Sequence, residues 1–222
     1  MVSCTLGIKS SGSFLNRSEM IDPLAGMLWV TGASALLMAI YFARSLNAPV
    51  IQMFRETVQK ETKQEAIVTN RSLLVSLGGL GALSLIQGVW MMDTWPLVGS
   101  YNILFGEIYA VFGLIVVSGA ASALKGYSLK GLSYLGALAG VWGLADAYGI
   151  LAGNLTSEPL VAAALYVSGA LAGILSVPAT HKPSRVTIGL LVLFLVLFAA
   201  ASIFLGASAS IEHLSSFSKY SP

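Results

Sequence analysis

Six long apolar segments alternate with short polar connections along the chain. Each segment is close to the ~20 residues with which an α-helix crosses the hydrocarbon core of a bilayer. The segments are apolar on all sides, whereas a helix on the surface of a soluble domain shows an apolar stripe. The pattern therefore predicts six transmembrane helices. They cover residues 22–44, 72–92, 103–124, 131–153, 159–178 and 186–206.

Lysine and arginine occur in every second connection between these segments. The first connection carries five, the third and the fifth carry two each, and the second and the fourth carry none. Basic residues are enriched in the cytoplasmic loops of membrane proteins. We therefore expect a multi-pass protein of the cell membrane whose N-terminus and C-terminus both lie outside. The basic residues that support this orientation are Arg44, Arg55, Lys60, Lys63, Arg71, Lys125, Lys130, Lys182 and Arg185.

Composition also indicates an integral membrane protein. Hydrophobic residues make up 56% of the chain, charged residues make up 10%, and the mean hydropathy is +0.81. Helix-length segments exclude a β-barrel, so the predicted fold is all-α, a compact bundle of six transmembrane helices. The bundle is expected over residues 20–208, between a disordered N-terminal tail (1–19) and a C-terminal tail (209–222). The net charge of +2 resides mainly in the loops, which favours the lipid bilayer, and not nucleic acid, as a partner.

The first connection is the one sizeable polar element. Residues 55–65 mix both signs of charge without glycine or proline, and Glu56 stands four residues before Lys60, which favours a short solvated helix. Pro49 is expected to break the chain before this helix. The segment is interpreted either as a solvated connector or as a docking surface for a protein partner.

Small residues four positions apart occur in three of the predicted spans. Such spacing lets helix backbones approach closely. The span 131–153 holds two of these pairs and is expected at the centre of the bundle, whereas the span 186–206 is rich in Leu, Val and Phe and is expected at its periphery. The pairs are Ser84 with Gly88, Gly136 with Gly140, Gly149 with Gly153, and Gly169 with Gly173.

A weak internal echo connects the second and fourth spans. Residues 80–88 match residues 135–143 in their glycine, alanine and leucine positions, and Tyr109 and Tyr166 occupy similar places in the spans that follow. The echo predicts that two helical hairpins form a parallel repeat about an axis along the membrane normal.

A layer of polar groups is predicted below the outer surface. At ~1.5 Å per residue, Glu107 lies roughly 6 Å into its span and Asp146 roughly 10 Å into its span. Gln87 and Tyr166 lie at similar depths. Carboxylates at such depths cost about 2–3 kcal/mol or more and usually face the bundle interior. We interpret the layer either as an outward-facing cation or proton site or as a hydrogen-bond network that fixes helix register.

The second connection has an unusual composition. Trp95 suits the interfacial aromatic belt, Pro96 and Gly99 mark a turn, and Asn102 is a candidate cap for the third span. Together with Asp93 and Tyr101 these residues form the outer loop motif.

The stretch that begins at Trp95 carries a family resemblance. WPLVGSYNILFGE (95–107) resembles the signature of an uncharacterised family of archaeal and bacterial multi-pass membrane proteins, and IDPL (21–24) resembles the start of that family's first span. The similarity covers residues 21–178. The resemblance implies the same six-span architecture and supplies no substrate.

Several chemistries lack their residues in this sequence. Neither His181 nor His213 lies inside a span, so no pair of axial haem ligands is available, and no span carries a central lysine for a Schiff base. Cys-x-x-Cys, His-Glu-x-x-His, Gly-x-Ser-x-Gly and phosphate-binding loops do not occur, and Cys4 is the single cysteine. We therefore expect no cofactor, no metal centre and no catalytic residue.

Three functions are compatible with this sequence. The first is a structural or accessory subunit of a membrane complex, or a homo-oligomer, since close-packing signals are clear and reaction signatures are absent. The second is a small cation- or proton-linked transporter or channel that uses the outer carboxylates. The third is an intramembrane enzyme that acts on a lipid or quinone, with Glu107 or Asp146 as acid or base.

Two acceptor patterns for N-glycosylation lie outside in the predicted topology. They begin at Asn16 and Asn154, whereas a third, at Asn70, lies inside. A glycan on Asn70 would contradict the topology.

Overall fold

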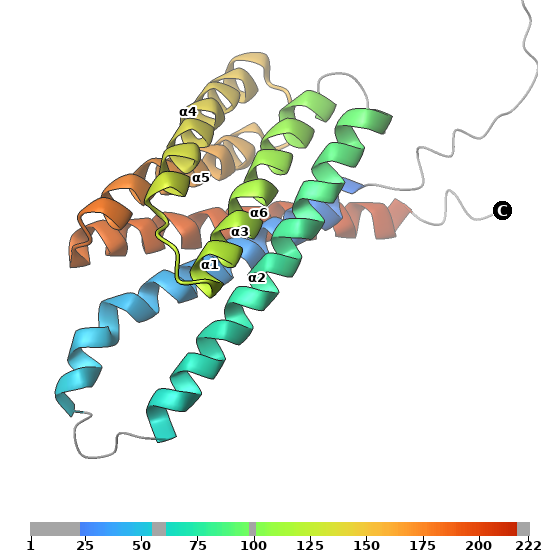
Figure 1. Cartoon of the computed structure of the whole chain (residues 1–222). Helices are drawn as coiled ribbons and strands as arrows, with labels where there is room; N and C mark the ends of the chain where they lie inside the picture. The colour runs from blue at the N-terminus through green and yellow to red at the C-terminus, as the bar shows by residue number, and fades with distance from the viewer. Residues whose placement is uncertain (1–22, 55–60, 98–100, 217–222) are drawn as a thin grey trace, which may run out of the picture.

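The structure is a computed structural model that describes residues 23–54, 61–97 and 101–216 (Figure 1). These residues form helices, and no strand occurs among them. A π-helical turn, η2 (Asn102–Glu107), leads directly into α3. The α-helices are α1 (Pro23–Phe54), α2 (Glu61–Thr94), α3 (Ile108–Leu124), α4 (Lys130–Gly153), α5 (Pro159–His181) and α6 (Arg185–Ser216).

Each of the six predicted spans lies in a helix that is long and apolar enough to cross a membrane. The membrane-length stretches begin and end within a few residues of the predicted spans, except in α6, where the stretch Arg185–Glu212 runs further. The predicted all-α bundle of six transmembrane helices is thus confirmed.

The helices extend beyond the hydropathic segments in three places. α1 continues through Pro49 to Phe54, so the expected break is not observed. α2 begins at Glu61, so the part of the predicted loop helix that the structure describes belongs to α2, while residues 55–60 lie outside the described part of the chain. α6 ends at Ser216, inside the expected C-terminal tail. Hydropathy marks where lipid surrounds a helix, not where the helix ends.

The bundle is built from three closely packed helix pairs. α2 packs mainly on α3, α4 on α5, and α1 on α6. Figure 1 shows α1 and α6 side by side, running across the other two pairs. The contacts between helices of different pairs are fewer in every case. We call the contact line inside each pair its seam.

Glycine allows direct backbone contact along the seams. A Cβ atom placed on Gly88 would lie 2.5 Å from the backbone nitrogen of Ala110, and one on Gly140 would lie 2.5 Å from the carbonyl oxygen of Ala170. In the third pair, a Cβ atom on Gly32 would lie 2.6 Å from Cγ1 of Ile203. Real Cβ atoms do not approach this closely, so Gly88 and Gly140, which face backbone atoms, require glycine in the observed packing, whereas at Gly32 the side chain of Ile203 would have to shift.

The α2–α3 and α4–α5 seams share one register, as the internal echo predicts. Equivalent positions meet in both pairs: Gly81 with Val116 and Gly136 with Gly173, then Leu85 with Gly113 and Gly140 with Ala170. The α1–α6 seam follows the same spacing, because Gly32 contacts both Ala199 and Ile203, which stand four residues apart. The α2–α3 and α4–α5 pairs are therefore variations of one antiparallel packing unit.

The expectation that the fourth span lies at the centre is wrong. Only 28% of the membrane-length stretch of α4 is buried, whereas α1 reaches 44%. The second small pair of α4 does not pack against another helix, since a Cβ atom on Gly149 would meet nothing within 4 Å. The expected periphery of the sixth span is confirmed, because its stretch is the least buried, at 22%.

Candidate functional site

The two ends of the bundle carry opposite charge. Between Asn70 and Glu212, the acidic residues lie toward the end where α2 and α4 finish, and the basic residues lie at the opposite end. We call these the acidic end and the basic end. The acidic residues are Asp93, Glu107, Asp146, Glu158 and Glu212, and the basic residues are Arg71, Lys125, Lys130, Lys182 and Arg185.

Two of the four residues expected in the polar layer interact through their charges. Glu107 ends η2, Asp146 lies in the last third of α4, and both side chains are partly buried. The carboxyl group of Asp146 lies within electrostatic range of both Glu107 and the hydroxyl of Tyr166. Oδ2 of Asp146 is buried and has no hydrogen-bond partner in the described part of the chain.

Tyr166 and Gln87 make two different hydrogen bonds. The hydroxyl of Tyr166 donates to the carbonyl oxygen of Leu104 over 2.6 Å, which ties α5 to η2. Gln87 instead accepts a bond of 3.1 Å from the hydroxyl of Tyr109 inside the α2–α3 pair. The sequence interpretation did not include Tyr109 in the layer, although the internal echo pairs it with Tyr166 and could have identified it.

The outer loop motif closes the acidic end of the α2–α3 pair. Trp95 adopts a left-handed backbone conformation with φ 49°. Its backbone N–H donates a hydrogen bond to the carbonyl oxygen of Met91, and α2 ends at this point. Asn102 does not cap α3 but is fully buried and bonds both backbone groups of Leu97, at 2.9 and 2.5 Å. Tyr101 stacks on Phe105 with ring centroids 6.2 Å apart.

The other motif residues have simpler positions. Asp93 is exposed, Pro96 is partly exposed, and Gly99 lies outside the described residues. The described contacts of the motif are structural, because they hold the end of α2 and Leu97 against the first residue of η2.

The glycosylation candidates stay predictions. Asn16 lies outside the described residues. Asn154 is exposed and ends α4 in a left-handed conformation with φ 49°.

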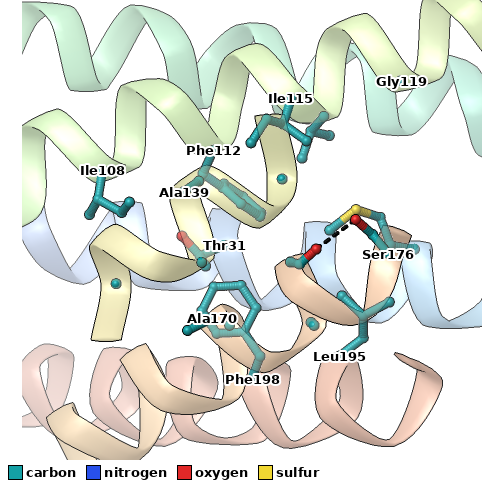
Figure 2. A pocket seen from close by; sticks show the side chains of 18 of the residues that line it. Thr31, Ile108, Phe112, Ile115, Gly119, Ala139, Ala170, Ser176, Leu195 and Phe198 are labelled. Carbon is teal, nitrogen blue, oxygen red and sulfur yellow. Dashed lines mark hydrogen bonds between the residues drawn. The ribbon is translucent and has the colours of Figure 1, made fainter. Parts of the chain in front are cut away.

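A central cavity of about 240 Å³ lies between the helix pairs, and all six helices contribute to its walls (Figure 2). Figure 2 shows Ile108, Phe112 and Ile115 on the wall that α3 forms, opposite Leu195 and Phe198 of α6. The rings of Phe112 and Phe198 meet edge to face, 5.7 Å apart. Along η2 and α3 the lining residues run from Phe105 to Ala123, a rise of about 27 Å at ~1.5 Å per residue, which is close to the ~30 Å hydrocarbon thickness of a bilayer.

The seryl and threonyl hydroxyl groups in the cavity wall already donate hydrogen bonds. Each of these seryl and threonyl groups bonds a carbonyl of its own helix, at 2.6–2.9 Å. They belong to Thr31, Ser133, Ser176 and Thr180. The remaining wall is almost entirely aliphatic and aromatic. The cavity is therefore a long apolar space and not a polar channel.

The sequence did not reveal this cavity. Its walls include glycine and alanine residues whose spacing predicted close packing, among them Gly136, Gly140 and Ala170. These residues do pack closely along a seam, but they also lie at the edge of a helix face that borders the space between pairs. The pairing of helices decides which faces meet, and spacing within one helix does not contain that information.

A comparison with known families places the chain. A family model described as "Protein of unknown function (DUF981)" matches residues 18–216, which include both stretches that carried the resemblance. No curated protein matches the chain, and no solved structure matches it.

Proposed function

Since the chain belongs to this family of proteins of unknown function, we propose a role from the structure itself: a structural or accessory membrane protein that holds one apolar lipid chain in its central cavity. The observation that supports this proposal is the size and apolar lining of the cavity. A ligand site in a helical bundle is typically such a space with few polar groups.

Water does not suit the central cavity. Its volume of about 240 Å³ has room for many water molecules, since one water needs roughly 10–15 Å³. Each buried water needs two to four hydrogen-bond partners. The hydroxyl donors of Thr31, Ser133, Ser176 and Thr180 are already engaged with helix carbonyls, so most of these waters would lack partners. Apolar cavities of this kind stay dry.

An empty cavity would be costly. The space is partly open to the surface of the bundle, and the apolar side chains of its walls lack van der Waals partners on that side unless another apolar group fills it. A lipid chain restores the missing van der Waals contacts and is present at high concentration around the protein. The length of the cavity, close to the hydrocarbon thickness, also fits a long chain.

The cavity is suited to hold a chain and not to convert it. In the part of the chain that the structure describes, the lining residues include no carboxylate, histidine or cysteine. The seryl and threonyl hydroxyls of the wall therefore have no histidine or carboxylate beside them among the lining residues that could activate them. This favours a structural or accessory role over the intramembrane enzyme.

The presence of a bound lipid in the purified protein tests this function directly. Native mass spectrometry of the full protein, purified in mild detergent, should show one bound lipid. Ala139→Leu adds bulk to the α4 wall and should remove the adduct. Ala145→Leu, the same change at an exposed position of α4, should leave it in place. An absent adduct in the wild type, or one that persists in Ala139→Leu, would refute the proposal.

A second candidate function rests on the carboxylate pair. The unpartnered Oδ2 of Asp146 and its repulsion from Glu107 favour a proton or a cation near the acidic end. A cation or proton site would then follow, as in a small transporter. Cation-dependent thermal stabilisation that disappears in Glu107→Gln would support it.

The orientation also stays a proposal. The basic end carries the Lys and Arg residues of the α3–α4 and α5–α6 connections, so we infer that it faces the cytoplasm. In intact cells, and with Cys4 replaced by serine (Cys4→Ser), a membrane-impermeant maleimide should label Glu158→Cys and should not label Tyr127→Cys. The reverse pattern would invert the topology.

A further inference from the structure

The lining of the central cavity runs from one edge of the apolar region of the bundle to the other. Along η2 and α3 it begins at Phe105, which precedes Glu107, and it ends at Ala123, two residues before Lys125. Charged side chains are costly inside a bilayer and therefore concentrate near the edges of its hydrocarbon region. The cavity thus extends through the levels of both leaflets.

The lining on α1 is equally long. It runs from Leu24, in the first turn of the helix, to Phe42, two residues before Arg44. In this wall, as in that of η2 and α3, the two ends stand 18 residues apart, which corresponds to about 27 Å at ~1.5 Å per residue. One leaflet provides only about half of the ~30 Å hydrocarbon thickness. The cavity is therefore longer than one leaflet is thick.

The cavity is continuous at half of its length. Figure 2 shows that Phe112 and Ile115 of α3 and Phe198 of α6 form the wall at this level. The contacting rings of Phe112 and Phe198 do not divide the space, because residues on both sides of them line the same cavity. The hydroxyl of Thr31, on α1, is already engaged with a carbonyl of its own helix. An apolar chain can therefore pass this level without leaving a polar group of these walls unpaired.

We propose that the chain in the cavity is longer than one leaflet is thick and crosses the midplane of the bilayer, as a polyisoprenoid does and a single acyl chain of a phospholipid does not. This inference rests on the proposed function, in which the cavity holds one chain. An acyl chain would fill about half of the cavity and would leave the walls of the other half without van der Waals partners. Two acyl chains, one from each leaflet, would require that two molecules are immobilised, whereas a long chain is immobilised as one molecule.

A chain-length series tests the inference. Farnesol, with three isoprene units, reaches through about one leaflet, and hexaprenol, with six units, reaches through about two. Each alcohol is added to the full, delipidated protein at the same mole fraction in the detergent, and thermal unfolding is measured. The two probes carry the same hydroxyl head group, so they differ in chain length. We expect hexaprenol to raise Tm by roughly 4 °C more than farnesol, because it occupies both halves of the cavity.

A matched pair of variants locates the crossing. Ile115 lines the cavity at about half of its length, so the larger side chain of Ile115→Trp should close the passage between the two halves. Farnesol should still raise Tm in this variant, but the advantage of hexaprenol over farnesol should fall by more than half. Leu114→Trp introduces the same side chain at the neighbouring residue, which is exposed on the outer surface of α3, and should keep this advantage.

The outcomes separate the two claims. If neither alcohol raises Tm, the chain-binding function itself is wrong. If farnesol stabilises the protein as much as hexaprenol, or if Ile115→Trp keeps the full advantage of hexaprenol, chain binding stands and the crossing of the midplane is refuted. Dioleoyl phosphatidylcholine is the third probe. Two copies bound per protein in native mass spectrometry, with a rise in Tm equal to that from hexaprenol, would refute a single long chain.

Discussion

The seams inside the helix pairs and the cavity between the pairs use the same small residues with opposite results. Along a seam, Gly81 and Gly140 bring two backbones into contact. Between pairs, Gly140 and Ala170 border an open space of about 240 Å³. The difference teaches that a small residue produces a tight contact where a neighbouring backbone packs against it, and an open space where none does. Stability is expected to come mainly from the seams and function from the cavity.

The largest effect is expected from a substitution that disrupts a seam. A Cβ atom on Gly81 would lie 2.5 Å from the backbone nitrogen of Val117, which cannot rotate away, so Gly81→Ala should destabilise the protein by about 3 kcal/mol. Gly79→Ala, two residues earlier on α2, meets nothing within 4 Å and should be neutral or stabilising by up to ~1 kcal/mol. Equilibrium unfolding in detergent measures both variants. Equal losses of stability in the two variants would show that close packing along the seam does not determine the effect.

The second largest effect is expected from a substitution that fills part of the cavity. Ala139→Leu buries three more carbon atoms against the walls and should stabilise lipid-free protein by about 2 kcal/mol. Ala145→Leu, on the exposed part of α4, should change its stability by less than about 0.5 kcal/mol. Thermal unfolding after delipidation provides the measurement. A clear loss of stability in Ala139→Leu would mean that this wall is already filled by protein.

A smaller effect concerns a polar tie between pairs. Tyr166 is buried and donates a bond of 2.6 Å to the carbonyl of Leu104, so Tyr166→Phe should cost about 1 kcal/mol. The ring stays in place, so the cavity and the bound lipid should be retained. Loss of lipid in this variant, seen by native mass spectrometry, would indicate that the hydroxyl contributes to the binding site.

The smallest effect separates the two roles of the carboxylate pair. If the pair is structural, the amide of Glu107→Gln keeps the hydrogen-bonding capacity of the side chain and removes a charge near Asp146. The substitution should then leave the stability unchanged or raise it by up to about 0.5 kcal/mol, measured by thermal unfolding.

The matched control for this change is Glu158→Gln, an exposed carboxylate at the same end. It should have no effect on Tm. Stabilisation by calcium or magnesium that is present in the wild type and absent in Glu107→Gln would favour the cation site instead.

The sequence predicted the spans well because hydropathy reports directly on the lipid environment. It also predicted the contact at Gly136 and Gly140, since these residues repeat on one helix face. It failed at Gly149, because the same spacing occurs there without a neighbouring helix. The continuation of α6 to Ser216 gave no hydropathic signal.

The candidate site was less accessible to sequence reasoning. Polar residues at a given depth, such as Glu107 and Asp146, can be located by counting from the span ends. The cavity cannot, because it results from how three pairs sit against one another. Asn102 illustrates a further limit, since its bonds to Leu97 depend on a loop geometry that the composition of the segment does not specify.

The most direct test of a lipid-filled cavity is an experimentally determined density map of the protein in a lipid nanodisc. The account predicts one continuous, tube-shaped density in the central cavity, beside the contacting rings of Phe112 and Phe198. A cavity that is empty, or that contains separate water-like peaks, would contradict it.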